Sequence, residues 1–528
     1  MRWLMLVLAM TWLTAGLFDR EPWKADEAYS IGIVYSTVTH GHWLVPTLAG
    51  EPFLEKPPLV FWLGALAVKA FSPPLPLHVA ARGANVAFMV LTFWLLYIAQ
   101  RHALGRAAAR CTVLLLAASP AYLFASRYLT ADLALLPGTA AVMLGLVRWQ
   151  QQRQHAGWLV GVGAGLGLMA KGLLVPGVTV VTVLLLMGWR PAWRGAWGRR
   201  QLWTASLGGL ISSLTWPVLL ARHSMTLLMN WLWDNNVGRF LGSNDLGPPN
   251  SRGELIGALA GMLLPALPLA LWYLLRRGRR LRDDPLLGPA IFAGVWLVVM
   301  LLSSTSRGLY GLPLLVPVCQ LGAAALRGAD QTPVWPVRWR RIWQTWGRVT
   351  AIGLAVAALA ALAASFAGWL PQRIGPPSPR LSAMVALLAL TWLLVVLRGE
   401  KTGVLLGAVL GLTLTFSAFL AVALPKVDAR TGYRQLFSDL NQHLPAAHGC
   451  TSSLRLGESE RGMLEYYTGL VTRRVEVDPQ ALRCPLHLEQ VRTVETDQHY
   501  LCAASSILWQ AQRPEHPEET FRVCRREP

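Results

Sequence analysis

Residues 287–303 read LGPAIFAGVWLVVMLLS, an apolar run that contains no charged side chain. A helix needs about 20 such residues to cross a bilayer, where a spanning segment must satisfy its own backbone. Similar runs recur through the first 424 residues and predict about 13 transmembrane helices. They lie at residues 3–17, 79–100, 112–125, 133–147, 158–170, 173–188, 202–220, 255–275, 287–303, 309–326, 349–370, 381–397 and 402–424. The sequence therefore predicts a polytopic α-helical membrane protein.

The composition excludes several other classes of protein. Hydrophobic residues make up 54% of the chain and charged residues 14%, whereas a soluble protein carries about 25% charged residues. This argues against a soluble enzyme, a disordered chain and a nucleic-acid-binding module. The net charge of +20 lies in the apolar part, where residues 1–425 hold 35 basic and 14 acidic side chains. A basic excess between apolar runs is typical of cytoplasmic loops.

The distribution of basic residues also predicts the topology. If residues 57–71 lie along the membrane surface, 22 of those 35 basic side chains, Arg2 included, fall on one side. If this run crosses the bilayer, Arg2 is separated from all the others. The positive-inside rule therefore predicts a juxtamembrane helix at residues 57–71. It also places two long loops, residues 18–71 and 221–254, on the periplasmic side.

Residues 425–528 have the composition of an ordinary soluble domain. Short alternating runs at residues 470–477 and 520–525 predict strands, and residues 433–443 predict a helix. We therefore expect a transmembrane domain over residues 1–424 and a small periplasmic α/β domain after it. Four cysteines in an oxidising compartment suggest two disulfides with three possible pairings, and zinc is less favoured because no CxxC pair is present. They are Cys450, Cys484, Cys502 and Cys524.

Acidic residues are rare in the first 425 positions, yet six of the 14 lie in the first predicted outward loop. Outward loops are often simply polar. Here, however, three segments of the loop form a detailed pattern: KADEAY at 24–29, GHWLVP at 41–46 and FLEKPP at 53–58. Four more short segments that contain polar or charged residues follow along the chain. They are YLTAD at 128–132, GLMAKG at 167–172, WDNNVGRF at 233–240 and SSTSRGLYGLP at 303–313.

These segments resemble, in the same order, motifs of the polyprenyl-phosphate-dependent GT-C glycosyltransferases of the ArnT and protein O-mannosyltransferase type. The resemblance covers nearly the whole membrane part, and its strength lies in the order of the motifs. It implies a GT-C fold and a polyprenyl-phosphate sugar as the donor substrate, with no further cofactor required.

Sugar transfer from such a donor releases a lipid phosphate, whose growing negative charge must be held by preorganised cations or hydrogen-bond donors. The side chains that match the motifs and carry this chemistry are Lys56, Arg239, Arg307 and Tyr310. A membrane-interface role is the alternative for each cation, since Lys and Arg anchor helix ends. We expect contacts with the sugar or another substrate group from Lys171, Glu55 and Tyr29.

Three carboxylates, Asp26, Glu27 and Asp132, are the candidate catalytic groups. An acceptor hydroxyl needs a general base, and Asp26 is well placed for this role at the mouth of the first span. If the acceptor is already a phosphate anion, Asp26 would instead orient the substrate or balance oxocarbenium charge. The alternative for each is a helix cap or a dipole-favoured neighbour of the cap. Asp132 begins an apolar run, where a carboxylate needs a cationic partner. We expect Arg127 to be that partner.

Two positions depart from the ArnT pattern. Tyr29 stands where that family usually has Arg, and Asn236 stands where it has His. In the relatives this His can join the Glu of the E-K-P motif, here Glu55, at a metal. Asn is a poor zinc ligand, so Glu55 and Asn236 remain possible ligands but a metal is not expected.

The sequence thus predicts an inverting glycosyltransferase of the bacterial inner membrane that acts on the periplasmic face. The resemblance suggests aminoarabinose as the sugar, undecaprenyl phosphate as its carrier, and lipid A or another envelope glycoconjugate as the acceptor, without nucleic acid. A protein O-glycosyltransferase is the near alternative. A lipid-linked sugar transporter should show broken spans in paired halves and ionisable groups at mid-membrane. An envelope scaffold would not need charged residues at so many outward loop edges.

Overall fold

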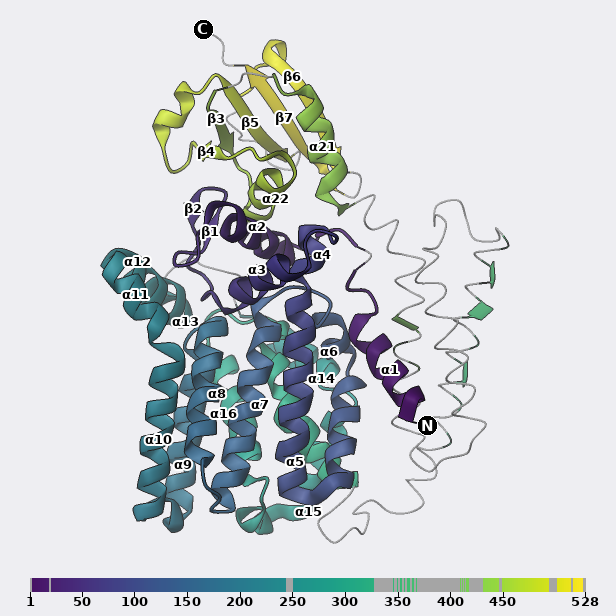
Figure 1. Ribbon diagram of the computed structural model, residues 1–528, viewed down its shortest axis with the longest axis vertical. Coiled ribbons are helices and arrows are strands. Elements are labelled where there is room, and N and C mark those ends of the chain that lie inside the picture. The colour runs from purple at the N-terminus through teal and green to yellow at the C-terminus, as the bar shows by residue number, and fades with distance from the viewer. Residues whose placement is uncertain are drawn as a thin grey trace.

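A computed structural model describes residues 2–18, 20–243, 250–326, 431–445, 449–492, 501–513 and 516–525, with isolated positions between 345 and 416. Its described parts form three layers (Figure 1). A bundle of upright helices lies at the bottom, short helices lie across its top, and a small sheet domain stands above them. The predicted order of a helical part followed by a small C-terminal α/β domain is confirmed.

The bundle consists of helices that bury apolar side chains against one another. Its helices are α1 (Arg2–Thr14), α5 (Gly83–Ala117), α6 (Pro120–Ala125), α7 (Ala131–Gln150), α8 (Ala156–Lys171), α9 (Leu174–Trp189), α10 (Ala196–Ser213), α14 (Arg252–Met262), α15 (Ala266–Arg277), α16 (Leu287–Leu302) and α17 (Leu315–Leu326). Short helical segments follow α10, and another one directly precedes α17. They are α11 (Thr215–His223), α12 (Met225–Met229), the π-helix η2 (Asn230–Gly238), α13 (Arg239–Leu241) and the 3-10 segment η4 (Gly308–Leu314).

Length and apolar composition identify the helices that can cross a membrane. Three described helices meet both criteria, at Leu77–Ala117, Ala131–Gln150 and Gly308–Leu326, and two bent pairs raise the number to five. Four further apolar helices have 10–17 residues. The runs expected at 349–370, 381–397 and 402–424 lie outside the continuously described residues. The number of about 13 spans therefore stays a prediction.

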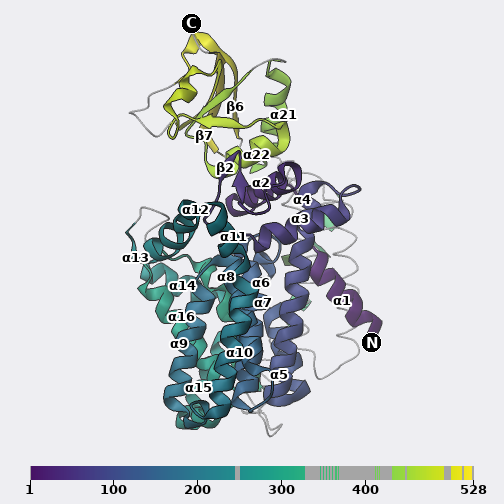
Figure 2. The ribbon, with the colours of Figure 1, turned by 60° about the vertical axis from the view of Figure 1, so that its left-hand side comes forward.

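Three helices, α2 (Ala25–His40), α3 (Leu59–Phe71) and α4 (Leu77–Ala81), lie across the top of the bundle (Figures 1 and 2). A short hairpin of β1 (Thr47–Leu48) and β2 (Glu51–Pro52) connects α2 with α3. With 13 residues, α3 is too short to cross a bilayer. Its length and position agree with a juxtamembrane helix, while the side of the membrane stays a prediction.

The C-terminal domain is a five-stranded sheet with the strand order β4-β3-β5-β7-β6. β3 pairs in parallel with β4 and β5, whereas β7 pairs antiparallel with β5 and β6. The elements are α21 (Tyr433–His443), β3 (Thr451–Leu454), α22 (Glu458–Thr468), β4 (Thr472–Arg474), β5 (Leu486–Arg492), β6 (Ile507–Arg513) and β7 (His516–Arg525). The helix and both strand regions expected here are present.

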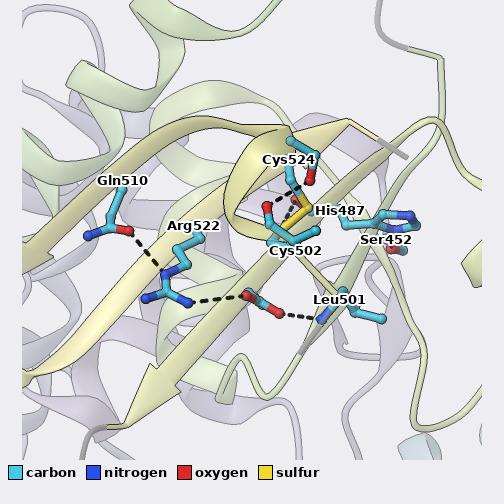
Figure 3. The surroundings of a disulfide bond; sticks show 10 residues. Ser452, His487, Leu501, Cys502, Gln510, Arg522 and Cys524 are labelled. Carbon is cyan, nitrogen blue, oxygen red and sulfur yellow. Dashed lines mark hydrogen bonds and ion pairs between the residues drawn. A yellow bond between two sulfur atoms is a disulfide. The ribbon is translucent and has the colours of Figure 1, made fainter. Parts of the chain in front are cut away.

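Two disulfides hold this domain. Cys450 is joined to Cys484, and Cys502 is joined to Cys524, which selects one of the three pairings that the sequence left open. Figure 3 shows the second bond beside His487, which is the register partner of Cys524 in the sheet. The first bond therefore joins the residue before β3 to the segment before β5, and the second ties the loop before β6 to β7.

Helix α22 fastens the C-terminal domain to α2. The two helices approach closely at Gly32 and Gly462: a Cβ added to Gly32 would lie 2.9 Å from the Cα of Gly462. Further along, Glu465 accepts hydrogen bonds from the Ala49 backbone N–H and from His40, both at 3.1 Å. At the other end of α22, Ser459 donates to the Ala25 carbonyl at the start of α2 at 3.3 Å, and both views show α22 above α2 (Figures 1 and 2).

Candidate active site

A cavity of about 590 Å³ lies where α2, the top of the bundle and the C-terminal domain meet. The lining residues below the C-terminal domain are Trp23, Lys24, Ala25, Asp26, Tyr29, Glu55, Lys56, Asp132, Lys171, Arg239, Arg307, Leu309 and Tyr310. The C-terminal part contributes Thr431, Tyr433, Gly457, Glu458, Ser459, Glu460, Arg513 and His516. Every residue expected from the sequence to bind or react lines this cavity, except Glu27 and the possible metal ligand Asn236.

Helix ends bring two of the expected carboxylates to the cavity. Asp26 lies in the first turn of α2, and Asp132 lies in the first turn of α7, where the helix dipole favours negative charge. The N-cap positions themselves are Lys24 and Thr130. Neither aspartate is therefore an N-cap. Both lie where the positive end of the helix dipole stabilises a carboxylate.

Asp132 forms a buried ion pair with Lys171 at the C-terminal end of α8. The two side chains are only 8% and 9% exposed. The Lys171 ammonium also lies 3.6 Å from the centre of the Tyr310 ring. The expectation of Arg127 as the partner of Asp132 is wrong. Arg127 donates to the Trp12 carbonyl and the Ser126 hydroxyl instead, on the side facing the bundle core.

Cations gather around Glu55 on another wall of the cavity. The Oε2 atom of Glu55 accepts from Lys56 Nζ at 3.2 Å and from Arg239 Nη1 at 3.1 Å. Burial opposes ionisation of Glu55, but these two cations outweigh it and hold the pKa of the carboxyl below its ordinary value. The side chain of Arg307 is exposed and lines the cavity, and it has no hydrogen bond or ion pair with any residue that the structure describes. One carboxylate, Glu55, thus faces three cations, so this side of the cavity carries net positive charge. We call Lys56, Arg239 and Arg307 the cationic wall.

Tyr29 lies between this wall and the carboxylates. Its ring packs on Phe53, with the ring centres 5.1 Å apart, and its hydroxyl donates to Asp26 at 3.4 Å. Burial and nearby carboxylates hold the pKa of the phenol well above its ordinary value. Tyr29 therefore stays protonated and can donate a hydrogen bond to a bound substrate.

The structure gives Glu27 a structural role in place of the expected catalytic one. Its side chain is fully buried and pairs with Arg20 and with Arg82, at 2.6 and 2.8 Å. It also accepts from the Leu129 backbone N–H at 3.2 Å. These contacts occupy both carboxylate oxygens of Glu27, which does not line the cavity. The two residues of the DE motif thus have different roles, because Asp26 faces the cavity and Glu27 faces the protein interior.

Asn236 also lies outside the set of cavity-lining residues. Its side-chain oxygen accepts from the Leu173 backbone N–H at 3.1 Å, and its amide donates to the Trp231 carbonyl at 2.7 Å. Asn236 therefore holds the turn that follows α8. Asn236 and Glu55 have different hydrogen-bond partners in the structure, and their role as a ligand pair stays a possibility raised by the sequence alone.

Sequence reasoning missed the part of the site that belongs to the C-terminal domain. Its residues follow none of the recognised motifs and lie hundreds of positions from the others. Glu460 accepts from the Tyr433 hydroxyl at 3.0 Å, and Arg513 donates to the Thr431 carbonyl at 3.0 Å. Only the contact between α22 and α2 reveals that these residues cover the cavity.

Comparison with known proteins agrees with this geometry. Residues 55–219 match the family of dolichyl-phosphate-mannose-protein mannosyltransferases. The crystal structure of ArnT from Cupriavidus metallidurans bound to undecaprenyl phosphate has a TM-score of 0.69 and 18% identity, and the match covers 99% of this chain and 97% of that one. The structure of the same protein in the apo state gives 0.67 and 17%. The chain therefore has the ArnT fold.

Curated relatives carry the name undecaprenyl phosphate-alpha-4-amino-4-deoxy-L-arabinose arabinosyl transferase. The relative from Pseudomonas paraeruginosa is 28% identical, over 68% of this chain and 65% of its own length. The second such protein of Sodalis glossinidius is 30% identical, over 61% and 58%. The chain thus spans less than two thirds of the length of these relatives. The fold is the one that the two ArnT crystal structures share. Together the family match, the relatives and the fold support an ArnT- and PMT-like GT-C glycosyltransferase.

Proposed function

We propose that this chain moves a sugar from polyprenyl phosphate to an envelope acceptor. The observation that carries the proposal is one cavity that joins a cationic wall, formed by Lys56, Arg239 and Arg307, to the carboxylate of Asp26. A phosphate anion needs the cationic wall, and a reacting anomeric centre needs the carboxylate. The names of the relatives support undecaprenyl as the lipid and an amino-deoxy pentose as the sugar.

In the proposed reaction, Lys56, Arg239, Arg307 and the Tyr310 hydroxyl hold the donor phosphate. The acceptor oxygen attacks the anomeric carbon while the bond from that carbon to the phosphate oxygen breaks. Attack opposite to the leaving group inverts the configuration. The cations stabilise the charge that grows on the leaving phosphate, in a cavity where water is partly excluded.

Asp26 has one of two roles, depending on the acceptor. An acceptor hydroxyl must lose its proton, and Asp26 would take it as a general base. A phosphate acceptor is already an anion, so Asp26 would then balance positive charge on the sugar ring. The Asp132–Lys171 pair stands beside this centre and, with Tyr29 and Glu55, would orient the sugar.

We further propose that residues 1–424 form the domain in the bacterial inner membrane and that residues 425–528 form a periplasmic domain. The active site would then open to the periplasm, where lipid A or another envelope glycoconjugate is the acceptor. A protein O-glycosyltransferase is the second candidate, favoured by the match of residues 55–219 to the protein mannosyltransferase family.

The test uses the full chain purified in detergent with a synthetic undecaprenyl-phosphate aminopentose donor. Lipid A, a neutral envelope glycolipid and a Ser/Thr-rich peptide are offered as acceptors in parallel, and products are identified by mass. Transfer to lipid A supports the main proposal, and transfer to the peptide supports the second candidate. Failure to release sugar to any acceptor, with donor binding absent as well, would overturn both.

A further inference from the structure

The hairpin of β1 and β2 lies in the chain directly before a residue of the cationic wall. Its strands pair antiparallel, with Leu48 opposite Glu51. The Phe53 N–H donates to the Pro46 carbonyl at 2.7 Å and closes the hairpin. Lys56 follows a few residues later. Because a segment of a few residues spans only a limited distance, the position of the hairpin restricts where Lys56 lies.

Contacts from the C-terminal domain hold this hairpin. Arg461 of α22 donates from Nη1 to Oε2 of Glu51 at 2.9 Å, and Arg474 of β4 donates to the same oxygen at 3.3 Å. At the turn, the Ala49 N–H donates to Glu465 of α22 at 3.1 Å. The Arg461 side chain is only 6% exposed, so its ion pair is less weakened by side-chain motion and salt than a surface pair. We call Arg461, Arg474 and Glu465 the clamp.

Packed side chains connect the hairpin to the cationic wall. Phe53 and Leu54 follow β2, and both are buried. Phe53 packs against the Tyr29 ring, and Leu54 lies in an apolar cluster formed by α8, α11 and η2. The next two residues, Glu55 and Lys56, form an ion pair with each other. Since close packing leaves little free space, a shift of the hairpin is passed on to Glu55 and Lys56.

The clamp also lies close to the cavity, as the charges around Glu458 show. Glu458 is the first residue of α22 and lines the cavity. Burial raises the pKa of its carboxyl, and the charge of Glu55 adds to this effect. The cations Arg461, Lys56 and Arg474 act in the opposite direction. Two clamp cations and one cation of the wall therefore act on the same carboxylate, so the clamp and the wall are neighbours.

We propose that Arg461 is a positioning residue for the donor phosphate, because through Glu51 and the hairpin it fixes Lys56 in the cationic wall. This inference rests on the proposed function, in which Lys56 binds that phosphate. Arg461 itself does not line the cavity. The C-terminal domain thereby sets the geometry of donor binding in addition to covering the cavity. Misplacing a catalytic group by about 1 Å can lower a rate by about 100-fold.

The first test measures donor binding, and sugar transfer at varied donor concentration, with the folded full-length protein in detergent. Arg461→Ala should raise Kd and KM for a synthetic undecaprenyl-phosphate aminopentose and lower kcat/KM by about 10–100-fold. Arg461→Lys, which keeps the charge, should recover part of this loss. A role in folding alone would reduce the amount of active protein and leave KM unchanged, which would overturn the inference.

Arg434→Ala is the matched control. Arg434 lies in α21 and also joins the C-terminal domain to the first predicted outward loop, but it does so through Glu21 instead of the hairpin. Its KM should stay that of wild type, and an equal rise there would overturn the inference. Glu51→Ala breaks the clamp contact from the other side, at a side chain that is 35% exposed. It should raise KM as Arg461→Ala does, and it provides the test if Arg461→Ala does not fold.

A double-variant cycle tests the route of the effect. If Arg461 acts by positioning Lys56, then adding Arg461→Ala to Lys56→Ala should lower kcat/KM by only about twofold more. Independent effects would multiply, so a further 10–100-fold loss would overturn the inference. If wild type neither binds the donor nor transfers sugar, the proposed function itself fails. An active wild type with normal donor binding in Arg461→Ala and Glu51→Ala defeats this inference alone.

Discussion

The contrast between Glu27 and its neighbour Asp26 gives the sharpest prediction. Glu27 is fully buried and neutralises part of the charge of Arg20 and Arg82. Burial alone would favour the protonated acid, yet the two guanidinium groups lower the pKa of Glu27 from 4.5 to about 2. This fall corresponds to about 3 kcal/mol of stabilisation of the charged form. Glu27→Gln removes it and takes the carboxylate charge away from two buried cations.

We therefore expect Glu27→Gln to destabilise the protein by about 3–5 kcal/mol, the usual cost of breaking a buried ion pair from one side. The melting temperature in detergent, followed by tryptophan fluorescence, should fall by several degrees. The stabilisation by Glu27 is fully present above pH about 4.5 and is lost as the pH falls toward 2. The difference between wild type and Glu27→Gln should therefore shrink over that range.

Asp26→Asn is the matched control, because Asp26 lies in the same turn of α2 but faces the cavity. It should leave the melting temperature nearly unchanged and lower single-turnover sugar transfer by roughly 10²–10⁴, with donor binding preserved. The reasoning would be refuted if Glu27→Gln melts like wild type while its turnover collapses. Near-normal turnover in Asp26→Asn would return that residue to a dipole-favoured structural role.

Further predictions concern the cations, the metal and the disulfides. Lys56→Ala should weaken donor-lipid binding, measured by a lipid-binding assay on the folded variant, because it removes one cation from the phosphate wall; unchanged binding would contradict the role. Sugar transfer should survive EDTA with little loss, since Asn236 holds a backbone turn; complete loss that zinc restores would show this wrong. Peptide mapping of unreduced protein should recover the pairs Cys450–Cys484 and Cys502–Cys524; four free thiols would contradict it.

Much of the fold could be predicted because its signals are local. Apolar runs such as residues 287–303 must form helices in a bilayer, whatever they pack against, and the structure has α16 there. The change to ordinary composition after residue 425 likewise predicts a separate domain. The helix at Tyr433–His443 and the strand that ends at Arg525 follow from local periodicity.

Only part of the candidate site could be predicted from local sequence signals. Motifs mark Asp26, Lys56, Asp132 and Lys171 as chemically unusual residues, and all four line the cavity. Their partners are a different matter, because pairing depends on how helices pack. The Asp132–Lys171 pair joins the start of α7 to the end of α8, which no spacing rule distinguishes from a pair with Arg127.

By itself, the sequence determined a helical part with apolar runs long enough to cross a membrane, a C-terminal domain of ordinary composition, and charged residues clustered in the loops between the apolar runs. Only the tertiary structure decided which member of the DE pair faces the cavity, since one helix turn presents Asp26 and Glu27 to opposite environments. It also decided that α22 covers the site with Glu458. The contact between Gly32 and Gly462 that places this helix joins residues hundreds of positions apart, and packing alone brings such residues together.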